Sequence, residues 1–389
     1  MKNGLLLIWG CLAACSLGAQ EWQKIHSQAI VVDTHNDFPS IAATNGYALG
    51  MDLKGRTHTD LKRLQQGGVD VQIWSIFCGG DQPQPFEWAN REIDSIYAWC
   101  QRYAANMVLV KTPDQLEAAV KNKKLASMMG VEGGHMIEND LQKLKMLFDR
   151  GARYLTLTWN NSTPWASSAL DETRQTPGIT PGLNDFGKEV VRTMNKLGML
   201  IDLSHVGEKT FYDVMATTTK PVLVSHSCVH TLCPVFRNLT DDQIRAIGKN
   251  GGVIHLNFYS GFIDSSFQRR TDSLNTETEK LAQAQAGGTA PTEAQKDAAK
   301  ASMATAYDAL RPSIDQLIDH ADHIIKLIGI DHVGLGSDFD GVSSLPSGLD
   351  DVSHFPLITK RLLERGYKRK DVEKILGGNF LRLFKAVQP

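Results

Sequence analysis

Eight short apolar runs, rich in β-branched residues, recur along the chain and are separated by segments long enough for helices. Helical periodicity is clear in residues 142–150 and 186–197. Strands that alternate with helices predict a parallel sheet, and eight such units in 389 residues predict a closed (β/α)8, TIM-like barrel of the α/β class. The expected strands are residues 30–33, 69–77, 126–131, 153–158, 199–203, 221–224, 252–258 and 332–336.

The composition favours one folded domain over residues 20–389, interrupted by a polar insert at 264–313 after the seventh strand. With 42% apolar and 22% charged residues, the chain can bury a large core. The insert is rich in Ala, Gln, Thr, Lys and Glu and is broken at 287–291; we expect two exposed helices around a turn, or a disordered linker. The 41 basic and 43 acidic residues give a charge of -2, so no nucleic-acid partner is expected.

The N-terminus has the pattern of an export signal. Lys2 precedes an apolar run at residues 5–14 that is too short to span a bilayer, which predicts a signal peptide over residues 1–19. Two processing sites compete: a lipobox at residues 12–15 would attach a lipid to Cys15, and ordinary cleavage after Ala19 would release the protein. We therefore expect an exported protein, either periplasmic or lipid-anchored on the outer face of a bacterial membrane, with no other membrane contact.

Six cysteines occur, two of them within the expected signal peptide. The other four are too few and too scattered to predict a disulfide scaffold, and none shows the Cys-x-x-Cys spacing of a thiolate zinc site.

Polar residues that can bind metal follow several of the expected strands. In a (β/α)8 barrel all strands end on one face, where active sites lie. Each of these residues alone is a weak signal, because a hydrogen-bonded core histidine is commoner than a ligand. Together, three imidazoles and two carboxylates could hold two metal ions that share one carboxylate, and N/O donors without thiolate suit zinc, with manganese or cobalt as alternatives. The candidate ligands are His35, Asp37, Glu132, His205 and His226.

Two further charged residues are candidates for contact with a substrate. Asp338 follows the eighth strand, where a carboxylate could take a proton from water or hold an ammonium group; the alternative is a turn residue. Arg237 follows His226, and a guanidinium near bound cations suggests an anionic ligand such as a carboxylate, although a surface arginine is the simpler explanation.

These motifs resemble those of the membrane dipeptidases, also known as renal dipeptidases or dehydropeptidases. The resemblance runs from about residue 25 to 384, apart from the insert, and so many motifs in the same order are highly specific. The matching stretches are 33–37, 130–135, 154–158, 163–165, 203–205, 225–227, 237–238, 257–259 and 336–341.

The resemblance implies two zinc ions per chain. One zinc would be bound by His35 and Asp37, the other by His205 and His226, with Glu132 bridging them. It further implies that Arg237 binds the C-terminal carboxylate of a dipeptide, that Asp338 contacts its N-terminal ammonium and transfers protons, and that the protein forms a homodimer.

One position departs from the family pattern. Mammalian members have a histidine after the fourth strand, where this chain has Trp159. Because an indole can only donate a hydrogen bond, assistance to the scissile carbonyl would have to come from zinc, from Asn160 or Asn161, or from the indole N–H. We expect Trp159, Asn160 and Tyr259 to contact the substrate.

The sequence thus predicts a metallo-dipeptidase in which a hydroxide bridging two zinc ions attacks the peptide carbonyl. Trp159 and the insert leave open a metal-dependent amidohydrolase that acts on another small amide, such as an acyl amino acid, a lactam or a cell-wall fragment. A barrel that binds peptide or metal without turnover is the third hypothesis.

Overall fold

The computed structural model describes residues 21–388. The expected signal peptide and the lipobox cysteine lie outside the described residues. Between residues 21 and 388, no helix is both long enough and apolar enough to span a bilayer. The four cysteines in this part of the chain, Cys78, Cys100, Cys228 and Cys233, are free thiols.

Eight parallel strands form a nearly closed barrel, which confirms the predicted fold. Each barrel strand pairs with the next along the chain, and a bridge between Asn36 and Phe339 brings the last strand back to the first. The strands are β1 (Val32–Asn36), β2 (Val71–Phe77), β4 (Leu125–Glu132), β5 (Ala152–Thr156), β6 (Leu200–Asp202), β7 (Leu223–Val224), β8 (Val253–Leu256) and β9 (Val333–Leu335).

A ninth strand, β3 (Met107–Leu109), was not predicted. It pairs with the first residues of β4, Leu125 to Ser127, whereas β5 pairs with β4 only from Met129 onward. Residues 107–110 read Met-Val-Leu-Val, an apolar run like the Pro-Val-Leu-Val of the strand predicted at 221–224, so a sequence signal for it was present. The strand fills the edge of β4 that β5 leaves free, so it adds to the sheet without entering the barrel.

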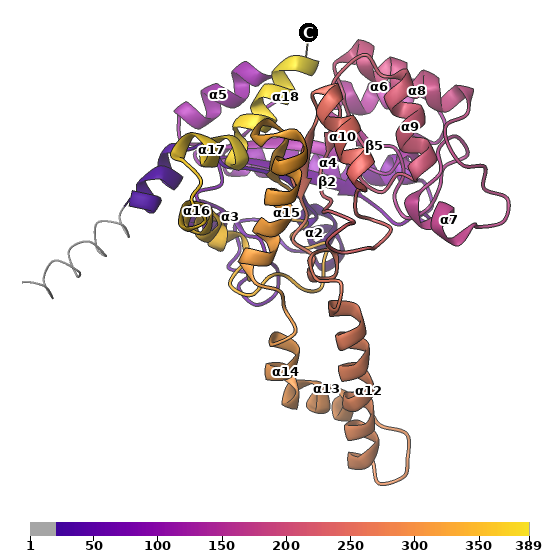
Figure 1. Cartoon of the computed structure of the whole chain (residues 1–389), viewed down its shortest axis with the longest axis vertical. Coiled ribbons are helices and arrows are strands. Elements are labelled where there is room, and N and C mark those ends of the chain that lie inside the picture. Colours follow the sequence, from indigo (N-terminus) through magenta and orange to yellow (C-terminus); the bar gives the residue numbers. More distant parts are fainter. Residues whose placement is uncertain (1–20, 389) are drawn as a thin grey trace, which may run out of the picture.

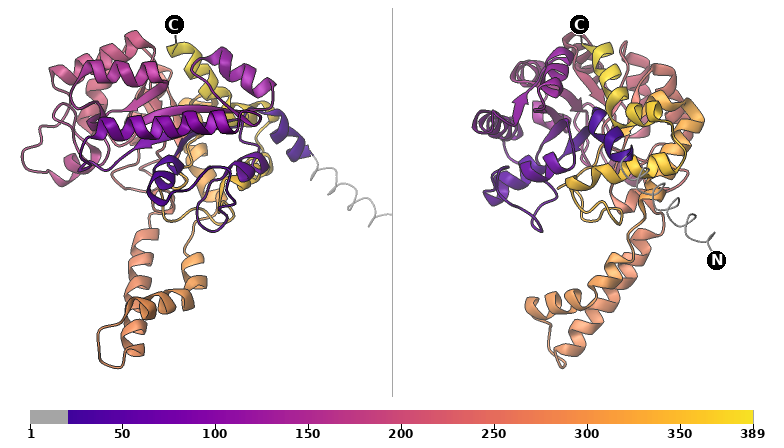
Figure 2. Two further views of the ribbon diagram at one scale, coloured as in Figure 1. Left: turned by 180° about the vertical axis from the view of Figure 1, so that it is seen from behind. Right: turned by 90° about the vertical axis from the view of Figure 1, so that its left-hand side faces the viewer.

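Helices surround the barrel on its outside (Figure 1, Figure 2). The expected helix at 186–197 is α8, which begins after the Asn184 cap and ends at Gly198 in the left-handed conformation. The helices of the barrel body are α2 (Phe38–Asn45), α3 (Leu61–Gln66), α4 (Pro85–Arg102), α5 (Pro113–Lys121), α6 (Leu141–Arg150), α7 (Ala169–Arg174), α8 (Asp185–Leu197), α9 (Glu208–Thr217), α10 (Asp241–Asn250), α11 (Ser260–Ile263), α15 (Ile314–Ile328), α16 (Phe355–Glu364), α17 (Arg369–Glu373) and α18 (Asn379–Val387).

The C-terminal helix α18 closes one end of the barrel. Phe380, Leu383 and Phe384 belong to the same apolar cluster as residues near the start of the strands, among them Val32 and Val71. Apolar side chains therefore fill the end of the barrel where the strands begin. The polar residues that follow the strands lie at the opposite end, where the strands finish.

The insert forms a helical arm that projects from the barrel (Figure 1, Figure 2). It consists of α12 (Phe267–Gln285), α13 (Glu293–Ser302) and α14 (Ala304–Asp308). The sequence predicted two helices around a turn, and the turn at Gly287-Gly288 is present. The third helix was missed because Met303, the only residue between α13 and α14, carries no helix-breaking signal.

Candidate metal centre

The five predicted ligands meet at the C-terminal ends of four barrel strands. His35 lies in β1 with Asp37 just after it, and Glu132 is the last residue of β4. His205 and His226 follow β6 and β7. All five residues are buried, with at most 7% of their surface exposed. Buried charged and polar groups at this density require compensation from one another or from a cation.

Glu132 lies between the histidines. Its Oε2 is 3.3 Å from His35 Nε2, and its Oε1 is 2.9 Å from His205 Nε2 and 3.5 Å from His226 Nε2. His35 Nε2 also lies 3.5 Å from Asp37 Oδ2. The two oxygens of one carboxylate therefore face two separate groups of donors, which is the arrangement of a bridging ligand.

These residues fit a pair of metal ions, because several of their buried nitrogen and oxygen atoms have no hydrogen-bond partner. Within residues 21–388, His35 Nε2 and Asp37 Oδ1 are buried without a hydrogen-bond partner. The Nε2 atoms of His205 and His226 face each other at 3.0 Å. Donor atoms of His35, Glu132 and His226 lie within 4.8 Å of one another, and so do those of His35, Asp37 and Asp338. Nitrogen and carboxylate donors without thiolate suit zinc and similar divalent ions.

Hydrogen bonds to the far side of each imidazole set its tautomer. His35 Nδ1 lies 2.8 Å from the Tyr154 hydroxyl, which in turn can donate to the Thr34 carbonyl at 3.3 Å. His205 Nδ1 lies 3.1 Å from Asn160 Oδ1, an atom that can only accept. Both rings therefore carry their proton on Nδ1, which leaves the Nε2 lone pair free for a metal.

His226 is held in the same way by a two-step chain. Its Nδ1 lies 2.7 Å from Ser225 Oγ, and Ser225 Oγ donates to Asp202 Oδ2 at 2.7 Å. With its own proton directed to Asp202, the serine accepts from the imidazole. The sequence analysis gave no role to Tyr154, Ser225 or Asp202. The sequence did contain one signal for Ser225: a serine or threonine directly precedes each of the three candidate histidine ligands.

Two glycines make room for this centre. A side chain at Gly130 would overlap the ring of Tyr154, so glycine there lets the tyrosine reach His35. A side chain at Gly341 would collide with the carboxylates of Asp37 and Asp338. Three other residues of the site adopt positive φ angles: His205 at 65°, Asp338 at 62° and Asp340 at 67°. Such conformations are unfavourable for residues other than glycine and often occur at functional sites.

The site separates charged from neutral groups. Burial would raise the pKa of Glu132, but His35 and the hydrogen bonds from the histidines hold it well below its usual range. Burial and nearby Arg237 lower the pKa of His205 to about 4. Burial and the Asp37 carboxylate raise the pKa of Asp338 to about 8. Glu132 is thus an anion beside the neutral imidazole of His205. Burial alone would lower the pKa of His35, but Tyr154 and the carboxylates of Glu132 and Asp37 raise it well above its usual value. Asp338 can accept or release a proton near neutrality.

A cavity of about 470 Å³ opens beside this centre. Predicted substrate contacts Trp159, Asn160 and Tyr259 all line it, together with Asp37, Glu132, Arg237 and Asp338. Trp159 packs against Phe77 at a ring distance of 5.0 Å and forms an apolar wall. Asn160 has a second role that was not predicted, because its amide oxygen holds His205.

Arg237 brings a positive charge to this cavity, and Asp338 brings a carboxyl group that becomes negative on losing its proton, with a pKa of about 8. Arg237 is buried, and its side chain donates to the His226 carbonyl at 3.3 Å and to Ser227 Oγ at 3.4 Å, both neutral acceptors. Burial lowers the pKa of this guanidinium to about 10, so it remains charged at neutral pH. Asp338 Oδ2 accepts from Asn257 Nδ2 at 2.8 Å. A small molecule with an anionic and a cationic end matches this pair of charges.

Comparisons with known proteins identify related sequences and structures. The model of the membrane dipeptidase family (peptidase family M19) matches residues 19–389. A protein of Schizosaccharomyces pombe named as an uncharacterized dipeptidase is 33% identical over 398 residues, covering 96% of this chain and 84% of that protein. Among solved structures, the probable dipeptidase PvdM from Pseudomonas aeruginosa has a TM-score of 0.78 at 23% identity and covers 96% of this chain and 99% of its own. A metallopeptidase from Rhodobacter sphaeroides, liganded with a phosphinate mimic of the dipeptide L-Ala-D-Ala, has a TM-score of 0.75 at 23% identity over 92% of this chain and 100% of its own.

Proposed function

The chain belongs to the membrane dipeptidase family of metallopeptidases, which hydrolyse peptide bonds, and from this premise we propose that it cleaves dipeptides with two zinc ions held by the five ligands. The observation that carries the proposal is Glu132, whose two oxygens face His35 on one side and His205 and His226 on the other. His35 and Asp37 would hold one zinc, and His205 and His226 the other. When bound, the ions would supply an activated water bridging them and would polarise the scissile carbonyl.

The charged residues of the cavity would select the substrate by its two ends. Arg237 would bind the C-terminal carboxylate, and Asp338 the N-terminal ammonium. A longer peptide has no terminal charge at one of these positions. The dipeptide mimic bound by the Rhodobacter sphaeroides metallopeptidase supports this assignment by similarity of fold.

Asp338 would also transfer the proton. Its raised pKa lets it take a proton from water and release it to the leaving amine. Trp159 replaces the histidine of mammalian relatives. Since an indole cannot accept a proton, the role falls to a carboxyl group. Asp338 and Asp340 both line the cavity, and burial raises their pKa values to about 8 and about 7; Asp338 is the one whose donor atoms lie near those of His35 and Asp37.

Removal of metal tests the proposal directly. We expect a chelator to abolish hydrolysis of a dipeptide panel, and two equivalents of zinc to restore it. Because the metals bind only the folded state, their removal should also lower the melting temperature. Metal analysis of the purified protein should give two zinc ions per chain. Full activity of the metal-free protein would refute the proposed reaction.

The variant Asp338→Asn tests proton transfer. We expect kcat to fall by about 10²–10⁴-fold, the usual contribution of a general acid or base. Donor atoms of Asp338 lie near those of His35 and Asp37, so the metal content of the variant must be measured as well. Loss of activity with two metals retained supports the proposed role; loss of one metal would make Asp338 a ligand instead.

We propose further that the mature protein is exported, carries either a lipid on Cys15 or a free end after Ala19, and forms a homodimer. The basic, apolar and small-residue pattern of residues 1–19 supports export. Mass spectrometry of the mature N-terminus separates the two forms, because a lipidated cysteine and an unmodified Gln20 differ in both mass and position.

A further inference from the structure

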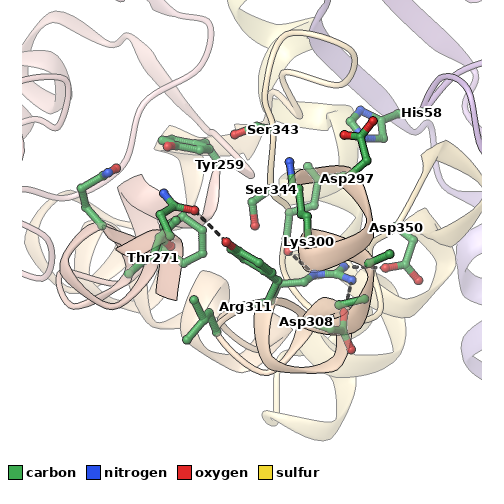
Figure 3. A pocket seen from close by; sticks show the side chains of 18 residues that line it. His58, Tyr259, Thr271, Asp297, Lys300, Asp308, Arg311, Ser343, Ser344 and Asp350 are labelled. Carbon is green, nitrogen blue, oxygen red and sulfur yellow. Dashed lines mark hydrogen bonds and ion pairs between the residues drawn. The ribbon is translucent and has the colours of Figure 1, made fainter. Parts of the chain in front are cut away.

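A second, larger cavity lies between the helical arm and the barrel loops (Figure 3). It has a volume of about 890 Å³, compared with about 470 Å³ for the cavity beside the metal ligands. Tyr259 and Ser343 line both cavities. We call the larger one the arm chamber; it adjoins the catalytic cavity at these two side chains.

Side chains of both signs line the arm chamber. Asp297 and Lys300 project from α13 on the arm toward the loop of Ser343 and Ser344 (Figure 3). Arg311 is already engaged, because it donates to Asp308 at 2.8 Å and to the Leu345 carbonyl at 2.7 Å. Within residues 21–388, neither Asp297 nor Lys300 takes part in an ion pair with the arginine or with each other. One cation and one anion thus remain available to a ligand.

A buried hydroxyl adds a third polar feature. Thr271 lies on α12 and lines the arm chamber, and its Oγ1 is buried without a hydrogen-bond partner in the described part of the chain. The aromatic rings of Phe267 and Tyr307 supply apolar surface in the same chamber.

We propose that the arm chamber is an extended substrate subsite. It would accept dipeptides in which one side chain is long and ends in a group that carries both an ammonium and a carboxylate. The side chain would pass between Tyr259 and Ser343, and its far end would meet Asp297 and Lys300. Binding energy gained so far from the scissile bond can raise kcat/KM for such substrates over small ones. The inference rests on the proposed dipeptidase function.

Matched substrates test this assignment. One probe is a dipeptide of alanine and lysine whose lysine Nζ carries a γ-glutamyl group, which ends in an ammonium and a carboxylate. The second carries a butanoyl group, of the same length but uncharged, and the third is alanyl-alanine. Each lysine probe is made with the lysine in either position. The measured quantity is the ratio of kcat/KM for each lysine probe to that for alanyl-alanine.

Variants on α13 separate the chamber from the catalytic cavity. Ala301→Trp fills the chamber and should lower the ratio for both lysine probes by about tenfold or more. Lys300→Gln and Asp297→Asn should lower only the ratio for the γ-glutamyl probe, toward that of the butanoyl probe. Ala298→Trp and Lys296→Gln lie on the same helix outside the lining, and should leave all ratios unchanged. Circular dichroism checks that each variant keeps its helices.

Calorimetry with a γ-glutamyl probe whose scissile amide is reduced to an amine gives a second measurement. If wild-type protein cleaves alanyl-alanine but Ala301→Trp alters no ratio, the arm chamber is not a substrate subsite and the inference is wrong. If no dipeptide is cleaved, yet binding of the reduced probe weakens in Lys300→Gln and not in Lys296→Gln, the chamber binds its ligand as proposed and the proposed reaction fails.

Discussion

Replacing Glu132 with glutamine should remove at least one of the two proposed zinc ions and reduce kcat/KM by about a thousandfold or more. Loss of an outer-shell partner of a metal ligand already costs about 10–100-fold. Glu132 faces both ligand groups, with its oxygens 3.3 Å from His35 Nε2 and 2.9 Å from His205 Nε2. Glutamine has the same shape but no charge, and its amide nitrogen would direct protons at one of the metals.

The measurement combines metal analysis with dipeptide kinetics. Glu138→Gln is the matched control, because Glu138 follows the same strand but pairs with Lys143 at the surface. The control should retain two metals and full activity. A fully loaded, active Glu132→Gln variant would show that this carboxylate does not bridge, and the proposed centre would then lack its shared ligand.

The variant Arg237→Ala should lower kcat/KM for dipeptides by about 100-fold or more. Truncating one partner of a buried, hydrogen-bonded charge pair costs about 2–5 kcal/mol. The guanidinium is buried and donates only to neutral oxygens within the described residues, so a substrate carboxylate would be its anionic partner. Most of the loss should appear in KM if the contact is equally strong in the ground state and in the transition state.

A dipeptide with an amidated C-terminus provides the decisive comparison. The wild-type protein should cleave the amide poorly, and Arg237→Ala should cleave the free acid and the amide at similar rates. Arg245→Ala, on the exposed face of α10, is the control for loss of one positive charge. If Arg237→Ala leaves dipeptide hydrolysis nearly intact, the natural substrate lacks a C-terminal carboxylate, and a different small amide becomes the better candidate.

The strands predicted from the sequence lie within a few residues of the observed ones at each end. The run predicted at 126–131 is found as β4 (Leu125–Glu132), and the expected helix at 142–150 is found as α6 (Leu141–Arg150). The two-residue β7 is shorter than the predicted run, because few of its backbone groups face a partner strand. Strand β3 was missed although residues 107–110 form an apolar run like the one predicted at 221–224.

The identity of the site residues followed from local order, because parallel strands deliver the residues after them to one face. The relative positions of these residues could not be predicted from local order. The tautomer of His35 depends on Tyr154, a residue 119 positions away that reaches it only because Gly130 has no side chain. Likewise, Asn160 was predicted to contact substrate and lines the cavity, but its amide oxygen also holds His205, which follows the neighbouring strand.

The sequence by itself determined the alternation of strands and helices and the donors that follow each strand, because both depend on residues that are neighbours along the chain. Only the tertiary structure decided which donor faces which, how each imidazole is oriented, and that the arm borders a second cavity beside the catalytic one. These features depend on distances between segments far apart in sequence, which are fixed when the barrel closes and its side chains pack.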